Sequence, residues 1–146
     1  MIVDVIWAMA NHRTDVDREW LTRGPLVEFG DTHIRVVPPE ELIWSKLYVL
    51  QKDRSDWPDI FNILHAAGAT LDWNHLLARL GEDRALLNAV LTVFRWLAPH
   101  RAAELPARLW HLKDGPTPPD DEVNCEHVRL LDTRPWFRPL ESGENC

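Results

Sequence analysis

The spacing of apolar positions divides the chain into a short β part and a longer helical part. Residues 2–7 form an apolar run rich in β-branched side chains, which is typical of a buried strand. Strand-like residues 26–29 and 33–37 flank Gly30-Asp31, a common signal for a β-hairpin. One strand and a hairpin predict a small mixed or antiparallel sheet, with a short helix over residues 15–21 between them.

From residue 39 onward the apolar positions follow the helical period. The pattern predicts about five helices, over residues 39–50, 56–67, 72–80, 83–98 and 104–112. The links between them are short, which favours antiparallel neighbours in a helical bundle. The sequence therefore predicts an α+β fold in which a small sheet precedes a bundle of about five helices.

A lysine interrupts the apolar stripe of the first long helix. The helical neighbours of Lys46 at four and three positions on either side are all apolar, namely Leu42, Ile43, Val49 and Leu50. In one interpretation its stem lies along the core and its amine reaches water or a carboxylate. In the other, the amine faces an anion such as a phosphate.

An aspartate interrupts the first strand in the same way. Asp4 shares a strand face with Ile2 and Ile6, and a buried carboxylate without a partner is costly. Either Asp4 meets a cation or projects into an active site, or residues 2–7 form an edge strand with Asp4 in water.

Composition limits the classes of function. The chain has 146 residues and a formal net charge of -7, which argues against a broad nucleic-acid-binding surface. No apolar run is long enough to cross a membrane and no secretory leader is visible, so we expect a cytoplasmic protein. Cys125 and Cys146 are expected to be free thiols, with a bridge between them as the alternative. Residues 114–146 begin with a Pro-rich acidic stretch and are interpreted as a linker and tail.

With these residues in view, the chain resembles bacterial nucleotidyltransferase-like proteins of the polymerase-β superfamily. The similar segment runs from about Val3 to Leu112, which is most of the chain. Its most specific part is an ordered series of a proline, two acids, a lysine, an arginine and two aspartates. The series lies in three runs, Pro39-Glu40-Glu41-Leu42-Ile43-Trp44-Ser45-Lys46-Leu47, Asp53-Arg54-Ser55-Asp56 and Asp59-Ile60. A second similarity lies at Leu71-Asp72-Trp73 with Leu76-Leu77.

The resemblance implies a function and a set of site residues. Such proteins transfer a nucleotidyl group from a nucleoside triphosphate to an acceptor hydroxyl with Mg²⁺. By position, Asp4 is similar to the third metal-binding carboxylate of the family, and Lys46 to a lysine that faces the nucleotide phosphates. Arg54, Asp56 and Asp59 are similar to a polar cluster at the next helix junction, which we interpret first as structural.

The chain departs from this family in one respect. The Asp-x-Asp pair that follows a Gly-Ser turn is missing before Asp4, and Asp15-Val16-Asp17 lacks the glycine turn. Residues 1–113 are therefore expected to be the C-terminal part of such a domain, with a sheet remnant over 1–37 and helices over 39–113. We expect the chain to be incomplete or inactive alone. The alternative is a non-catalytic pseudo-enzyme or protein-interaction module, acting as a homo-oligomer or with a partner chain.

Overall fold

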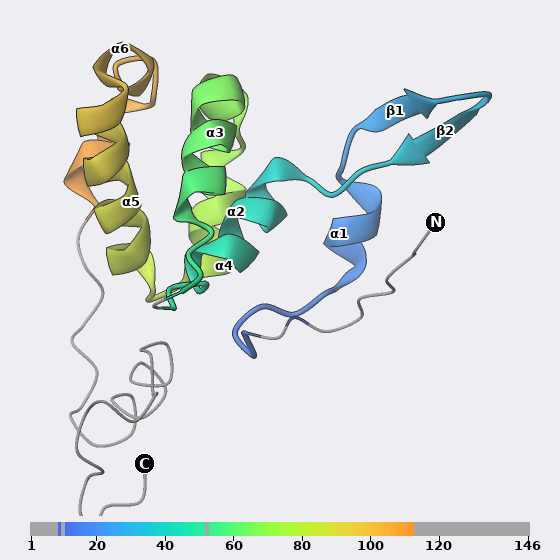
Figure 1. The fold of residues 1–146 in the computed structure, drawn as a ribbon, viewed down its shortest axis with the longest axis horizontal. Coiled ribbons are helices and arrows are strands. Elements are labelled where there is room, and N and C mark those ends of the chain that lie inside the picture. Colours follow the sequence, from blue (N-terminus) through green and yellow to red (C-terminus); the bar gives the residue numbers. More distant parts are fainter. Residues whose placement is uncertain (1–8, 10, 52, 113–146) are drawn as a thin grey trace, which may run out of the picture.

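The computed structural model describes residues 9, 11–51 and 53–112. Within these residues a two-stranded antiparallel hairpin is followed by helices, which confirms the α+β class (Figure 1). The elements, in order, are α1 (Arg18–Thr22), β1 (Leu26–Phe29), β2 (Thr32–Arg35), α2 (Pro39–Leu47), α3 (Trp57–Ala67), the 3₁₀ helix η1 (Gly68–Thr70), α4 (Trp73–Leu80), α5 (Arg84–Leu97), α6 (Pro99–Ala102) and the 3₁₀ helix η2 (Ala107–His111).

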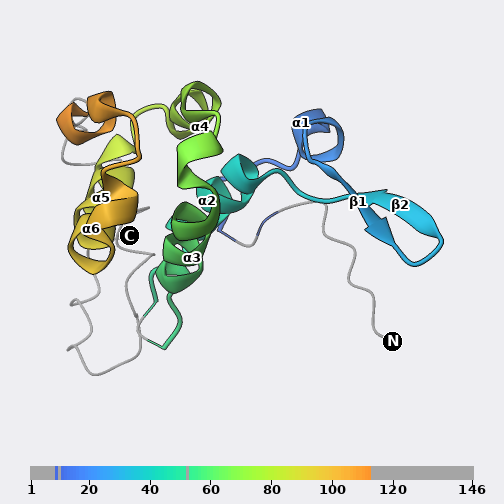
Figure 2. The ribbon, with the colours of Figure 1, turned by 90° about the horizontal axis from the view of Figure 1, so that it is seen from above.

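The hairpin projects from the helices, at the opposite end of the described structure from α5 and α6 (Figures 1 and 2). Gly30 has a φ of 58°, the left-handed conformation that lets the turn close between the strands. Opposed pairs place Val27 with Ile34 and Phe29 with Thr32, so one face of the ribbon is mainly apolar. All eight strand residues are nevertheless exposed, and Phe29 retains 68% of its accessible surface.

Helix α2 lies at the centre of the helical part, because it packs against both α3 and α4, while α3 also packs against α5 (Figure 1). Its Ile43 and Leu47 side chains are fully buried. The core formed around them consists of Trp20, Ile43, Trp44, Leu47, Tyr48, Ile60, Leu64, Leu71, Trp73, Leu76, Leu80, Leu87, Val90, Leu91, Phe94, Ala102, Leu105 and Leu109.

Aspartates stand at the start of four helices, but only two of them cap through the side chain. The Asp17 and Asp72 carboxylates accept hydrogen bonds from Glu19 N and His75 N at 2.9 Å and 3.0 Å. The carboxylates of Asp56 and Asp83 instead contact residues of other elements. These two aspartates therefore join helices to one another rather than closing their own helix.

The largest differences from the sequence prediction lie in two helices, while α1 begins three residues later than expected and α6 was not predicted. Helix α2 ends at Leu47, so Val49 and Leu50 lie beyond it, and Leu50 forms an isolated bridge with Ser55. The segment expected as one helix over residues 104–112 is instead the 3₁₀ helix η2, because Pro106 precedes it with an extended ψ of 128°. The predicted strand over 2–7 and the tail over 114–146 lie outside the described residues.

Core packing between α2 and α4 predicts a large difference between two leucine substitutions. Leu76 is fully buried, so Leu76→Ala should lower the free energy of unfolding by about 2–5 kcal/mol through lost burial and a new cavity. Leu21 is 72% exposed, and Leu21→Ala should change it by less than about 0.5 kcal/mol. Urea unfolding of both variants measures the difference, and equal losses would contradict this assignment of the core.

Candidate functional site

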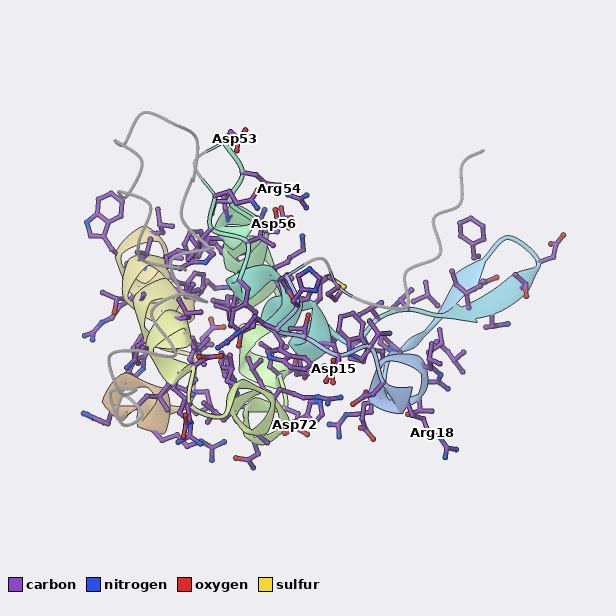
Figure 3. The ribbon with its side chains drawn as sticks, turned by 90° about the horizontal axis from the view of Figure 1, so that it is seen from below. Asp15, Arg18, Asp53, Arg54, Asp56 and Asp72 are labelled. Atoms are coloured by element: carbon purple, nitrogen blue, oxygen red, sulfur yellow. The ribbon has the colours of Figure 1, made fainter. Side chains whose placement is uncertain are left out.

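The polar residues that carry the family resemblance come together at the junction of α2 and α3. The Lys46 Nζ atom lies 3.1 Å from Asp56 Oδ2 and 2.7 Å from Asp59 Oδ2. Arg54 reaches the other oxygen of Asp56, with its Nε 3.2 Å from Oδ1. Figure 3 shows Arg54 and Asp56 pointing toward one another at the start of α3. We call these four residues the α2–α3 junction cluster.

The junction cluster holds its charges in place. Burial alone would lower the pKa of Lys46, but hydrogen bonds to Asp59 and Asp56 outweigh burial and raise that pKa above its usual value. Burial would raise the pKa of Asp56, yet the hydrogen bonds from Arg54 and Lys46 lower it. Lys46 is therefore a stable ammonium, and Asp56 a stable carboxylate that receives both cations.

Exposure differs among the members of the junction cluster. The side chains of Lys46 and Asp56 are 21% and 14% exposed, whereas that of Asp59 is 57% exposed. The two cations and two carboxylates sum to no net charge. This geometry corresponds to the first interpretation of Lys46, in which its amine meets carboxylates at the edge of the core. An incoming anion would have to displace Asp59, the outermost partner.

The most buried charged side chain of α2 is Glu41, not Lys46. Glu41 is fully buried, and its Oε1 lies 2.6 Å from His75 Nε2 and 3.0 Å from Arg79 Nε. Its second oxygen, Oε2, is buried and makes no hydrogen bond within the described part of the chain. In the sequence Glu41 stands out only as one of two acids in the first turn of this helix, so its contact with α4 was not predicted.

Arg79 extends this contact to α1. Its two terminal nitrogens bind both oxygens of Asp17, the residue that caps α1, at 2.6 Å and 2.8 Å. Its guanidinium also lies 5.0 Å from the centre of a Trp44 ring, within the range of a cation–π contact. The hydrogen bond to Asp17 is the main cause that raises the pKa of Arg79. We call Asp17, Glu41, His75 and Arg79 the α1–α2–α4 cluster.

A third polar contact joins α2 to the start of α5. Asp83 accepts hydrogen bonds from Arg13 at 2.9 Å and from the Tyr48 hydroxyl at 2.7 Å. Burial raises the pKa of Tyr48, and the Asp83 carboxylate raises it further, so the phenol stays protonated and donates. Arg13 and Asp83 are both partly buried, which indicates that this contact has a packing role.

The structure does not place all of the predicted site residues. Asp4, the predicted metal ligand, and the two cysteines lie outside the described residues. Within residues 9, 11–51 and 53–112, no group of three or more His, Cys, Asp or Glu side chains has the arrangement of a metal site. In the same residues no helix is long and apolar enough to cross a membrane.

Comparison of this chain with protein-family models, with curated proteins and with solved structures found no match.

Two helix-capping aspartates, Asp17 and Asp72, predict loss of stability in acid, because both have a lowered carboxyl pKa. Arg79 lowers the pKa of Asp17, and the His75 amide and Arg23 lower that of Asp72. A carboxyl whose folded pKa is depressed stabilises the fold above its unfolded pKa, about 3.9, and this contribution is lost as pH falls through the folded value. We therefore expect the free energy of unfolding to fall between about pH 5 and pH 2.

The matched variants for this prediction are Asp17→Asn and Asp15→Asn. Asparagine can still cap α1, but it removes the titrating group beside Arg79, so Asp17→Asn should give a shallower acid dependence in urea unfolding. Asp15 is exposed, and Asp15→Asn should leave the acid dependence as it is. Equal slopes for Asp17→Asn and the unaltered chain would show that the Asp17–Arg79 pair does not contribute.

Proposed function

We propose that this chain is a nucleotidyltransferase-like protein that contributes the phosphate-facing side of a site for nucleotidyl transfer. The supporting observation is that Lys46, Arg54, Asp56 and Asp59, which are separated in sequence, form one cluster at the α2–α3 junction. These are the polar residues on which the family resemblance depends. Because these four side chains contact one another, each fixes the position of the others, as expected for residues that act together in one site.

The proposed reaction moves a nucleotidyl group from a nucleoside triphosphate to an acceptor hydroxyl with Mg²⁺. Asp4 would be one carboxylate ligand of Mg²⁺, whose preferred ligands are oxygens. Lys46 would contact the phosphates, since its amine stays charged and partly exposed. Residues outside this chain would supply the remaining carboxylates that two-metal phosphoryl chemistry requires. A cytoplasmic location fits a nucleoside triphosphate as the substrate.

Asp59 gives this proposal a specific mechanism. It is the more exposed of the two carboxylates on Lys46, so a triphosphate can replace it with little loss of packing. Asp56 is more buried and also bound to Arg54, so it would stay on Lys46 and fix the position of the amine. In this account Lys46 exchanges one carboxylate for a phosphate when nucleotide binds.

Calorimetric titration of the full chain with ATP and Mg²⁺ tests this exchange. Asp59→Asn removes the competing carboxylate and should tighten nucleotide binding, whereas Lys46→Met should abolish it. Arg18→Met is the matched control, because it removes an exposed positive charge on α1, apart from the junction cluster (Figure 3), and should leave binding unchanged. Loss of binding in Asp59→Asn, or equal binding by Lys46→Met, would contradict a phosphate-facing Lys46.

A second candidate function is a non-catalytic interaction module. It is favoured by the exposed apolar residues of the hairpin, where Val27, Phe29 and Ile34 lie on one face and retain 42%, 68% and 41% of their accessible surface. Isolated two-stranded hairpins are marginally stable, so this ribbon gains from a partner surface. If no nucleotide binds to the folded chain, the titration supports this module and refutes the nucleotide site.

A further inference from the structure

Helix α5 carries a second apolar stripe on the side away from the core. Trp96, Leu97 and Val93 keep 82%, 51% and 39% of their accessible surface, and the smaller Ala85 and Ala89 are exposed on the same side. Their spacing of three and four residues lines them up along the helix. The buried face of α5, turned the other way, consists of Leu87, Val90, Leu91 and Phe94.

This stripe is unusual for an exposed helix surface. Single exposed apolar residues are ordinary, but a contiguous stripe with an exposed tryptophan marks a contact surface. The stripe follows α5 over residues 85–97, about 18 Å at 1.5 Å per residue. An apolar segment of similar length could cover it.

We propose that residues 128–140 of this same chain dock on the α5 stripe. This segment has the required apolar content, with the large side chains Val128, Leu130, Leu131, Trp136, Phe137 and Leu140. It is too short and too isolated in sequence to build a core of its own. Docking would remove both sets of apolar side chains from water, which is the main source of association free energy.

The last described residue lies next to the stripe. The described structure ends at Leu112, whose carbonyl oxygen accepts a hydrogen bond from Asn88 Nδ2 at 3.1 Å. Asn88 is the neighbour of Ala89 on α5, so the chain departs beside the stripe. Residue 128 is 16 positions farther on, and an extended chain of that length reaches about 50 Å, well beyond the far end of the stripe.

Charge attracts the connecting residues, rather than the segment itself, to the C-terminal helices, because residues 128–140 carry three arginines against one aspartate. Residues 84–112 contain four arginines, Arg84, Arg95, Arg101 and Arg108, against one acid, Glu104, in a protein whose formal net charge is -7. The connecting residues 113–127 contain five acids, Asp114, Asp120, Asp121, Glu122 and Glu126, against Lys113. The acidic connection is therefore attracted to the basic C-terminal helices and keeps the apolar segment close to the stripe.

Hydrogen–deuterium exchange of the full chain tests the docking. Amides of residues 128–140 should exchange at least tenfold more slowly than in a free peptide of the same sequence, at concentrations where sedimentation gives the mass of one chain. Trp96→Ala should remove this protection while the amides of α3 keep theirs, since Trp96 lies outside the core. Leu21→Ala, another exposed apolar truncation, is the control and should leave the protection unchanged.

Three results would overturn the proposal, and none depends on nucleotide binding. The first is exchange of residues 128–140 at the free-peptide rate in the unaltered chain. The second is full protection of that segment in Trp96→Ala. The third is protection that appears only when the sedimenting mass doubles, because the stripe would then be covered by a second copy.

Discussion

The arrangement of the helices depends on one buried acidic side chain, Glu41, whose carboxyl group lies in the core. A fully buried carboxyl group is costly unless hydrogen-bond donors contact it. His75 and Arg79 of α4 contact its Oε1, whereas Oε2 makes no hydrogen bond within the described residues, and Arg79 also binds Asp17 at the start of α1. The electrostatic requirement of one residue therefore determines where two neighbouring helices can pack.

The junction cluster follows the same rule on the other side of α2. Asp56 stands at the N-cap of α3, but its carboxylate binds Lys46 and Arg54 and makes no capping hydrogen bond. Helix α2 is thus held by charge to α4 at its beginning and to α3 at its end, with Ile43 and Leu47 buried between the two contacts. If Lys46 contacts a phosphate, as we propose, it does so from a position that this packing has already fixed.

Sequence patterns predicted the elements better than the contacts between them. The hairpin around Gly30 and the helix starts at Asp56, Asp72 and Asp83 follow from local rules of turns and caps, which act within a few residues. The shorter end of α2 and the 3₁₀ form of η2 were missed, since the apolar period continues past Leu47 and across residues 104–112.

Of the polar contacts, the sequence predicted those between residues close in the chain and missed those between distant helices. Lys46 was identified because charge interrupts an apolar stripe, and its nearby acids were visible ten and thirteen residues on. Glu41 was missed because a first-turn glutamate is ordinary, and its partners lie 34 and 38 residues away on another helix. The spacing of His75 and Arg79, one helical turn apart on α4, was the available signal, but only tertiary packing reveals what they face.

Glu41 and Arg79 act as one unit in this fold, and a double-mutant cycle with Glu41→Gln and Arg79→Met measures the coupling between them. Each single variant leaves a buried charge with fewer partners, so each should lose about 3–5 kcal/mol of unfolding free energy, and the double variant clearly less than the sum. The exposed pair Arg101 and Glu104 is the control, with coupling below about 0.5 kcal/mol expected for Arg101→Met and Glu104→Gln. Additive losses for Glu41→Gln and Arg79→Met would show that the two side chains act independently.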